Sequence, residues 1–157
     1  LAVLSEEILY QLLDIMPVAR LGLLDGVGLP EAMPIVFARV SDGLFSPIDG
    51  KPKSSAKLAR IKLIENQPKG TLLLDHYHDN WEQLWWVKMD IEATVISMEH
   101  NLWDQAVSGL RAKYPQYHSV SLFKDNPTMI GVRWTRVRWW ASNELKGIKR
   151  WIETRVV

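Results

Sequence analysis

The stretch FSPIDGKPKSSAKLARI, from Phe45 to Ile61, decides how the rest of the chain is interpreted. A short strand ends at its beginning, and a turn that carries Lys51 and Lys53 follows. The apolar spacing after the turn predicts a helix that begins at Ser54 or Ser55. The sequence therefore predicts a strand, a basic turn and a helix in immediate succession.

This arrangement is typical of a phosphate-binding site. The first N–H groups of a helix have no intrahelical partner and lie at the positive end of the helix dipole. Two lysines just before them, with Lys57 one turn inside the helix, favour the binding of a phosphate group. The alternative is that the turn lysines are ordinary solvated charges and that Lys57 points to water.

The composition indicates a folded globular chain and excludes several chemistries. Of the 157 residues, 47% are hydrophobic and 24% are charged, and the formal net charge is +1. The chain thus lacks the overall positive field that is typical of nucleic-acid-binding proteins. Because cysteine is absent, a disulfide framework, a thiolate nucleophile, an iron–sulfur cluster and a Cys-ligated zinc site are excluded. No apolar run has the length of a membrane span, and the opening residues do not form a signal peptide, so we expect a cytoplasmic protein.

Apolar periodicity predicts a mainly β chain with inserted helices. Strands are expected at 18–24, 32–40, 44–46, 71–77, 84–96 and 128–140, and helices after Ser5, from the Ser54–Ser55 pair to Asn66, and at 102–113. Six strands in hairpin-like succession indicate an antiparallel β-barrel with an N-terminal helix and two inserted helices. We expect a single domain over 1–157, with its core at about 5–141. The basic, amphipathic tail at 143–157 either forms a short helix or reaches a partner.

Tryptophan is unusually frequent, with eight residues against three phenylalanines. Tryptophan has a large apolar face and a polar edge, and it is enriched in interfaces and ligand sites. The alternative for each is an ordinary place in the core, above all for Trp103.

Together, the order and spacing of these motifs resemble the pyridoxamine 5′-phosphate oxidase-like, FMN-binding split-barrel family. Paired strands, Phe45-Ser46, Lys51-Pro52-Lys53 and a helix that ends at an Asn-x-Pro carry this resemblance. The segments LDHYHDNW (74–81) and LWWV (84–87) are similar to the branch of coenzyme F-420 (deazaflavin)-dependent oxidoreductases. The resemblance implies a six-stranded antiparallel split β-barrel that forms a homodimer.

In this family FMN or the deazaflavin coenzyme lies at the subunit interface. By position, Lys51 and Lys53 match two basic phosphate ligands, and Phe45 and Ser46 match a Tyr-Thr pair whose hydroxyl helps to hold the phosphate. The resemblance further implies the strand Pro34, Ile35, Val36 and Phe37 beside the isoalloxazine ring, and Trp81, Trp85 and Trp86 from the other subunit. Lys57 is added to the cofactor-binding positions from its place in the first turn of the helix.

The resemblance implies hydride transfer between the bound cofactor and a small organic acceptor. Such a cofactor supplies the redox chemistry, which explains why no catalytic dyad or triad stands out, and no catalytic residue is assigned. The segment 136–142 (RVRWWAS) does not reproduce the C-terminal Trp-and-Arg pattern of the true oxidase, so oxidation of vitamin B6 is not expected. No residue separates FMN from deazaflavin.

Two other functions stay open. The chain either binds a flavin without turnover, or binds single-stranded nucleic acid through basic residues interleaved with tryptophan, namely Arg133, Arg136, Arg138, Trp139 and Trp140. The near-zero net charge favours an exposed strand face packed at a dimer interface instead.

His76 and His78 are two residues apart, so both point to one side if they lie on a strand. A metal site there needs a third ligand that the sequence does not show. Two polar residues at a strand end are the favoured interpretation, and no metal is expected.

Overall fold

The computed structural model describes residues 3–48, 55–124 and 126–156, and nothing is described of the side chains at 55–57. Its centre is a sheet of seven strands in the order β2-β1-β5-β6-β7-β4-β3, in which every neighbouring pair is antiparallel. The elements in chain order are α1 (Glu6–Ile15), β1 (Ala19–Leu24), β2 (Pro30–Ile35), β3 (Ala38–Val40), β4 (Gly43–Pro47), α2 (Ser55–Asn66), β5 (Lys69–His76), the 3₁₀ helix η1 (Trp81–Gln83), β6 (Trp85–Ile96), α3 (Trp103–Lys113), the 3₁₀ helix η2 (Pro115–His118), β7 (Met129–Ala141) and α4 (Glu144–Arg155).

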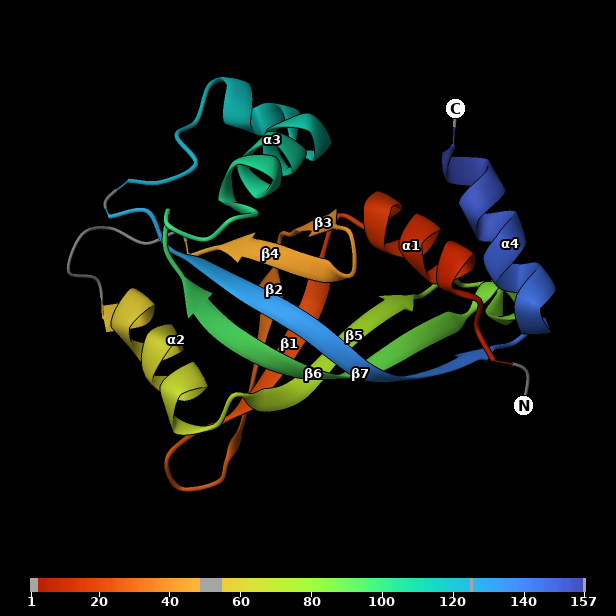
Figure 1. Cartoon of the computed structure of the whole chain (residues 1–157). Coiled ribbons are helices and arrows are strands. Elements are labelled where there is room, and N and C mark those ends of the chain that lie inside the picture. The colour runs from red at the N-terminus through yellow and green to blue at the C-terminus, as the bar shows by residue number, and fades with distance from the viewer. Residues whose placement is uncertain (1–2, 49–54, 125, 157) are drawn as a thin grey trace.

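The long strands β6 and β7 form the middle of the sheet and curve across the molecule (Figure 1). Their alternation places one set of side chains inward, including Val87, Met89 and Ile91, which are all buried. A register shift between Asp90 and Ile91 interrupts the ladder with β7, and such irregularities bend a strand and increase its twist. The sheet therefore curls into the antiparallel barrel that the sequence predicts.

The expected count of six strands is wrong, because the predicted strand at 32–40 is two strands. β2 pairs with β1, and β3 pairs with β4, so the two segments lie at opposite edges of the sheet. Val36 and Phe37 connect them. The apolar run of 32–38 continues through the connection, so it does not reveal this change of partner.

The helices pack around the sheet: α1 and α3 against the edge strand β3, α2 against β1 and β6, and α4 against β7. Ser5 caps α1 by accepting a hydrogen bond from the Ile8 N–H at 3.2 Å, and the face with Leu9, Leu12 and Leu13 is buried. The tail forms α4, which lies beside α1 (Figure 1). Ile148 and Ile152 of α4 belong to the main hydrophobic cluster, so the tail packs on its own chain. α3 packs against β3 around the buried Trp103.

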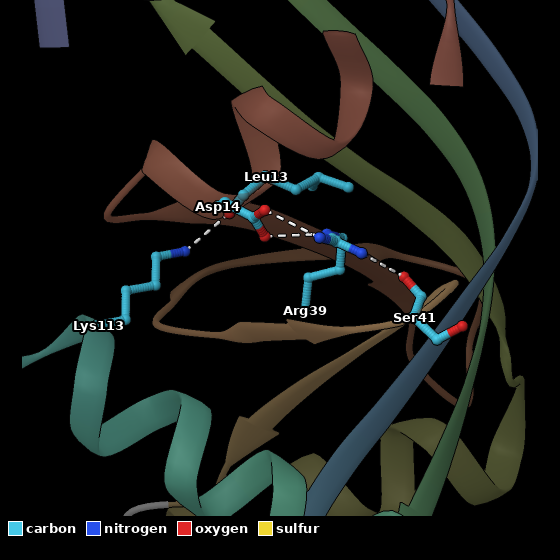
Figure 2. A network of polar contacts seen from close by, with 5 residues as sticks. All are labelled: Leu13, Asp14, Arg39, Ser41 and Lys113. Carbon is cyan, nitrogen blue, oxygen red and sulfur yellow. Dashed lines mark hydrogen bonds and ion pairs between the residues drawn. The ribbon is translucent and has the colours of Figure 1, made fainter. Parts of the chain in front are cut away.

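A polar network fixes the end of α1 to the strands at the sheet edge (Figure 2). Arg39 of β3 donates two hydrogen bonds of 2.9 Å, one to each carboxylate oxygen of Asp14. A third donor of the same guanidinium reaches the carbonyl oxygen of Ser41 at 2.7 Å. Ser41 has a φ of 55° in the turn between β3 and β4, so the arginine bonds to a backbone group in an unfavourable conformation. From α3, the Lys113 ammonium donates to the carbonyl oxygen of Leu13 at 2.8 Å.

Candidate functional site

The predicted phosphate site begins at the end of β4. This strand lies between β3 and β7, and all five of its residues are buried. Ser46 lies opposite Ile130 of β7 and is 2% exposed. In the described ranges it is the one polar residue among the buried side chains. After β4, the Ile48 N–H donates to the Thr128 carbonyl oxygen at 3.0 Å, which keeps the strand end against β7.

The helix after the basic turn begins at Ser55, as the sequence predicts. α2 contacts β6 and β1, and its buried Ile64 joins the main hydrophobic cluster. Lys51 and Lys53 lie outside the described residues, and the side chain of Lys57 is not described. The described chain thus contains the strand and the helix on either side of the basic turn, and the assignment of the three lysines stays a prediction.

Phe45 and Ser46 face opposite sides of β4, as successive residues of a strand must. The Phe45 ring packs against the α3 side of the molecule, in a cluster with Trp103 and Leu110. The ring of His100 meets it edge to face at 5.7 Å between centroids. Phe45 has no hydroxyl, so at the matched Tyr-Thr pair the one side chain able to bond to a phosphate is Ser46.

The second predicted part of the site, 34–37, runs along β2 and into the connection to β3. Ile35 and Phe37 are buried, while Pro34 is exposed and Val36 is half-buried. β2 is an edge strand that pairs with β1 alone in the described sheet. Its other side therefore presents backbone N–H and C=O groups that no strand takes up.

The three tryptophans matched to the cofactor region do not share one environment. Trp81 opens η1 and is 68% exposed, whereas Trp85 is 2% exposed. Trp86 is half-buried on the outer face of β6, where the Lys88 ammonium lies 4.6 Å from its ring centroid. Trp81 and Trp86 are accessible at the surface of this chain, and Trp85 is part of its interior.

Trp85 belongs to an aromatic cluster that sequence reasoning missed. Its ring centroid lies 5.1 Å from that of Trp151 in α4 and 6.2 Å from that of His76 at the end of β5. The signal for it was the pair Ile148 and Ile152, whose spacing of one helical turn marks a buried helix face in the tail. Trp151 lies between them in sequence.

The basic residues of β7 are partly neutralised by an acid on the neighbouring strand. Arg138 donates to a carboxylate oxygen of Asp90 at 2.6 Å, and Arg136 lies 4.0 Å from the other oxygen. A single carboxylate thus lies between two of the arginines that the nucleic-acid alternative needs. This pairing favours an internally balanced strand face over a surface for phosphates.

A possible metal site at His76 and His78 finds no third ligand in the described ranges, where no group of three or more His, Asp or Glu could hold an ion. The His76 and His78 rings lie 6.2 Å apart, and the His78 Nδ1 accepts a hydrogen bond from the Asn80 N–H at 2.9 Å. No helix in the described part of the chain is long and apolar enough to cross a bilayer.

No family model matches the sequence, and a search of curated proteins finds no match. Solved structures do share the fold. A conserved hypothetical protein from Mycobacterium tuberculosis is 18% identical with a TM-score of 0.68, over 92% of this chain and 89% of its own. A FAD-binding protein from Mesorhizobium loti is 18% identical with a TM-score of 0.63, over 87% and 94%.

A third structure, a Listeria innocua protein provisionally assigned as a pyridoxamine 5′-phosphate oxidase, is 14% identical with a TM-score of 0.59, over 88% and 98%. Heme storage and heme-binding proteins have related structures as well. At these identities the likeness concerns the fold alone. The expectation of a split barrel is therefore confirmed: this chain has the antiparallel split-barrel fold of pyridoxamine 5′-phosphate oxidase-like proteins.

Proposed function

We propose that this chain is a cytoplasmic, homodimeric oxidoreductase that binds FMN or the deazaflavin coenzyme F-420 and transfers a hydride between that cofactor and a small organic acceptor. The observation that carries the proposal is that β4 and α2 lie in a split barrel on either side of the sequence Lys51-Pro52-Lys53. Ser46 is buried at the end of the strand, and the helix begins at Ser55. A protein of the same fold binds FAD.

The donors of this segment suit a phosphate group. Lys51 and Lys53 supply positive charge, Ser46 supplies a hydroxyl, and the first turn of α2 supplies free backbone N–H groups. Each charge-assisted hydrogen bond from a lysine to a phosphate contributes about 1.5–3 kcal/mol. The free backbone groups along the edge strand β2 suit the polar rim of a planar ring. When bound, a flavin or deazaflavin supplies the hydride chemistry, and the protein binds it and orients it.

The first test is binding of FMN and of coenzyme F-420 to the purified protein, followed by cofactor absorbance and quenching of tryptophan fluorescence. The double variant Lys51→Ala/Lys53→Ala should bind at least tenfold more weakly, because two charge-assisted bonds are lost. The matched control is Lys62→Ala/Lys69→Ala, which removes two exposed lysines elsewhere. Equal affinity in the first variant and the wild type would contradict the phosphate assignment.

Turnover is a separate question, since a flavin-binding protein without catalysis is the second candidate. The fold also occurs in heme storage and heme-binding proteins, which makes binding without turnover a concrete alternative. Mixing the protein with reduced cofactor and an organic acceptor in a stopped-flow instrument distinguishes the two. Reoxidation that is faster than in free solution supports an enzyme, and an unchanged rate with every acceptor supports a binding protein.

The proposed homodimer is tested separately, by measuring the molar mass of the protein in solution with analytical ultracentrifugation.

A further inference from the structure

A cavity of about 450 Å³ lies beside α4, and Figure 1 shows α4 and α1 side by side at the end of the molecule opposite α2. Three elements form it: the end of α1 with the residues after it, the last residue of β5, and α4. The lining residues are Ile15, Met16, Pro17, His76, Trp151 and Arg155. None of them belongs to the segment assigned to the flavin phosphate, and the nearest residue matched to the cofactor is Trp85, which lies behind His76 and Trp151.

Aromatic rings form one wall of the cavity. The His76 and Trp151 ring centroids lie 5.7 Å apart, and Trp85 stands behind them in contact with both rings. Ile15, Met16 and Pro17 supply the apolar residues on the α1 side. A flat aromatic group is the ligand that such walls favour, because ring faces and edges pack on one another with a preference beyond simple burial.

The cluster also contains hydrogen-bond donors that the described chain leaves unused. The indole N–H groups of Trp85 and Trp151 are both buried, and neither has an acceptor among the described residues. A buried donor without a partner is costly, and native structures usually satisfy such groups. Both nitrogens lie below the surface of the cavity, so they mark a cluster that the described chain leaves incomplete and do not themselves contact a ligand in the cavity.

The charge of the cavity comes from Arg155. Its guanidinium carbon lies 5.1 Å from the centroid of the Trp151 ring, and no described carboxylate forms an ion pair with it. The lining residues include no acid. Burial and the nearby charge of Arg155 lower the pKa of His76 below its ordinary value, so the neutral imidazole predominates at pH 7. The cavity therefore carries one positive charge beside aromatic walls, and no carboxylate in the described ranges neutralises it.

We propose that this cavity binds a small planar aromatic anion of the aryl carboxylate class. The ring of the ligand lies against Trp151 and His76, and its carboxylate pairs with Arg155. Guanidinium groups bind carboxylates with charge-assisted, frequently two-pronged hydrogen bonds, which sets the orientation of the ligand. The proposal does not depend on the proposed flavin function.

The test uses 2-naphthoate as the probe and isothermal titration calorimetry of the full chain. Wild-type protein should bind 2-naphthoate with a stoichiometry of one per chain, and Arg155→Gln should weaken binding about tenfold. The matched control is Arg150→Gln, because Arg150 is another arginine of α4 and lines a different pocket. Arg150→Gln should leave the affinity unchanged.

Two further measurements distinguish a specific site from nonspecific binding. The neutral analogue 2-naphthamide should bind the wild type and Arg155→Gln equally, since it has no charge for the guanidinium. In NMR spectra of nitrogen-15-labelled protein, the indole N–H signal of Trp151 is assigned by its absence from the spectrum of Trp151→Phe. Addition of 2-naphthoate to the wild type should shift this signal. The proposal is overturned if the wild type does not bind the probe at millimolar concentration. It is also overturned if both arginine variants lose affinity alike, or if the Trp151 signal does not move.

Discussion

The hydroxyl of Tyr114 bonds to the backbone of Phe37 at the point where the chain passes from one edge of the sheet to the other. The Phe37 N–H donates to the hydroxyl oxygen at 3.1 Å. The single hydroxyl proton has two carbonyl oxygens in reach, Pro17 at 2.8 Å and Phe37 at 3.1 Å. Tyr114, at the end of α3, thus bonds to backbone groups of the β2–β3 connection that form no hydrogen bond within the sheet. The backbone of this connection therefore has hydrogen-bond partners without pairing to a strand.

Removing this hydroxyl should destabilise the protein. Tyr114→Phe leaves the Phe37 N–H without its acceptor and the Pro17 carbonyl without its donor. An unsatisfied buried group of this kind costs about 1–3 kcal/mol of the free energy of unfolding. Urea unfolding followed by tryptophan fluorescence measures the change. The control is Tyr77→Phe, which removes the same atom from a side chain that is 68% exposed and should have no measurable effect.

The ion pair of Arg39 and Asp14 should couple more strongly than the pair of Arg20 and Asp75. The first has two 2.9 Å hydrogen bonds and an arginine side chain that is 19% exposed. The second is a 3.6 Å contact with an arginine that is 53% exposed. Double-mutant cycles with alanine should give about 1 kcal/mol for the first pair and a value close to zero for the second.

The cycle is necessary because Arg39 also lies over the ring of Tyr10, at 4.0 Å from its centroid. The single variant Arg39→Ala loses this contact as well as the ion pair, and the cycle subtracts it. Equal coupling energies for the two pairs would show that the two hydrogen bonds between Arg39 and Asp14 do not strengthen the ion pair.

Lys113 should make stability depend on pH in the alkaline range. Burial lowers the pKa of its ammonium group from 10.5 to about 8. Between these values the unfolded chain binds more protons at this position than the folded protein does, so the free energy of unfolding rises with pH from about 8. Tyr114 acts in the opposite sense, because burial raises its pKa from 10.0 to about 12. Its contribution therefore falls as the pH passes about 10.

The measurement is the free energy of unfolding in urea from pH 7 to pH 10, for the wild type and for Lys113→Met. The difference between the two curves isolates the contribution of the lysine to the pH dependence. We expect the free energy of unfolding of the wild type to rise relative to that of the variant as the pH increases above about 8. Lys113→Met also removes the ammonium from its place 3.7 Å from the Phe37 ring centroid, which shifts the variant curve as a whole. A difference that does not change with pH would contradict the lowered pKa.

Gly70 should not tolerate a side chain. A Cβ atom at this position would collide with the carbonyl oxygen of Gly22 and approach a methyl carbon of Leu23 to 2.9 Å, where β5 passes β1. The obstacle is backbone and cannot rotate away, so Gly70→Ala should lower the free energy of unfolding by about 1–3 kcal/mol. Gly26→Ala is the matched control, since no atom lies within 4 Å of a Cβ there. Similar melting temperatures for the two variants would contradict the close approach.

Local patterns predicted the helices and long strands because their signals are contained in the segment itself. Ser55 and Pro68 mark the limits of α2, which ends at Asn66. The alternation that predicts a strand at 84–96 agrees within one residue with β6. The strand at 128–140 likewise agrees with β7, Met129–Ala141.

The division of 32–40 into two strands was not predictable from that segment. Nothing in its sequence breaks the apolar run at Val36 and Phe37, and the groups that satisfy the break come from Tyr114, 77 residues away. The site was predictable to the extent that it depends on β4 and α2. The burial of Trp85 was not predictable, because Trp85 packs against Trp151 of α4. The position of α4 is set by its contacts with α1 and β7.

The connection between β2 and β3 also limits how far the sheet can open. Val36 and Phe37 alone separate the two edge strands in sequence, so the Cα atoms of Ile35 and Ala38 can never be more than about 11 Å apart. The two rims are tied covalently where no ladder of hydrogen bonds joins them. An edge strand that detaches therefore pulls on the opposite edge, and we expect β2 and β3 to exchange their amide hydrogens as one cooperative unit.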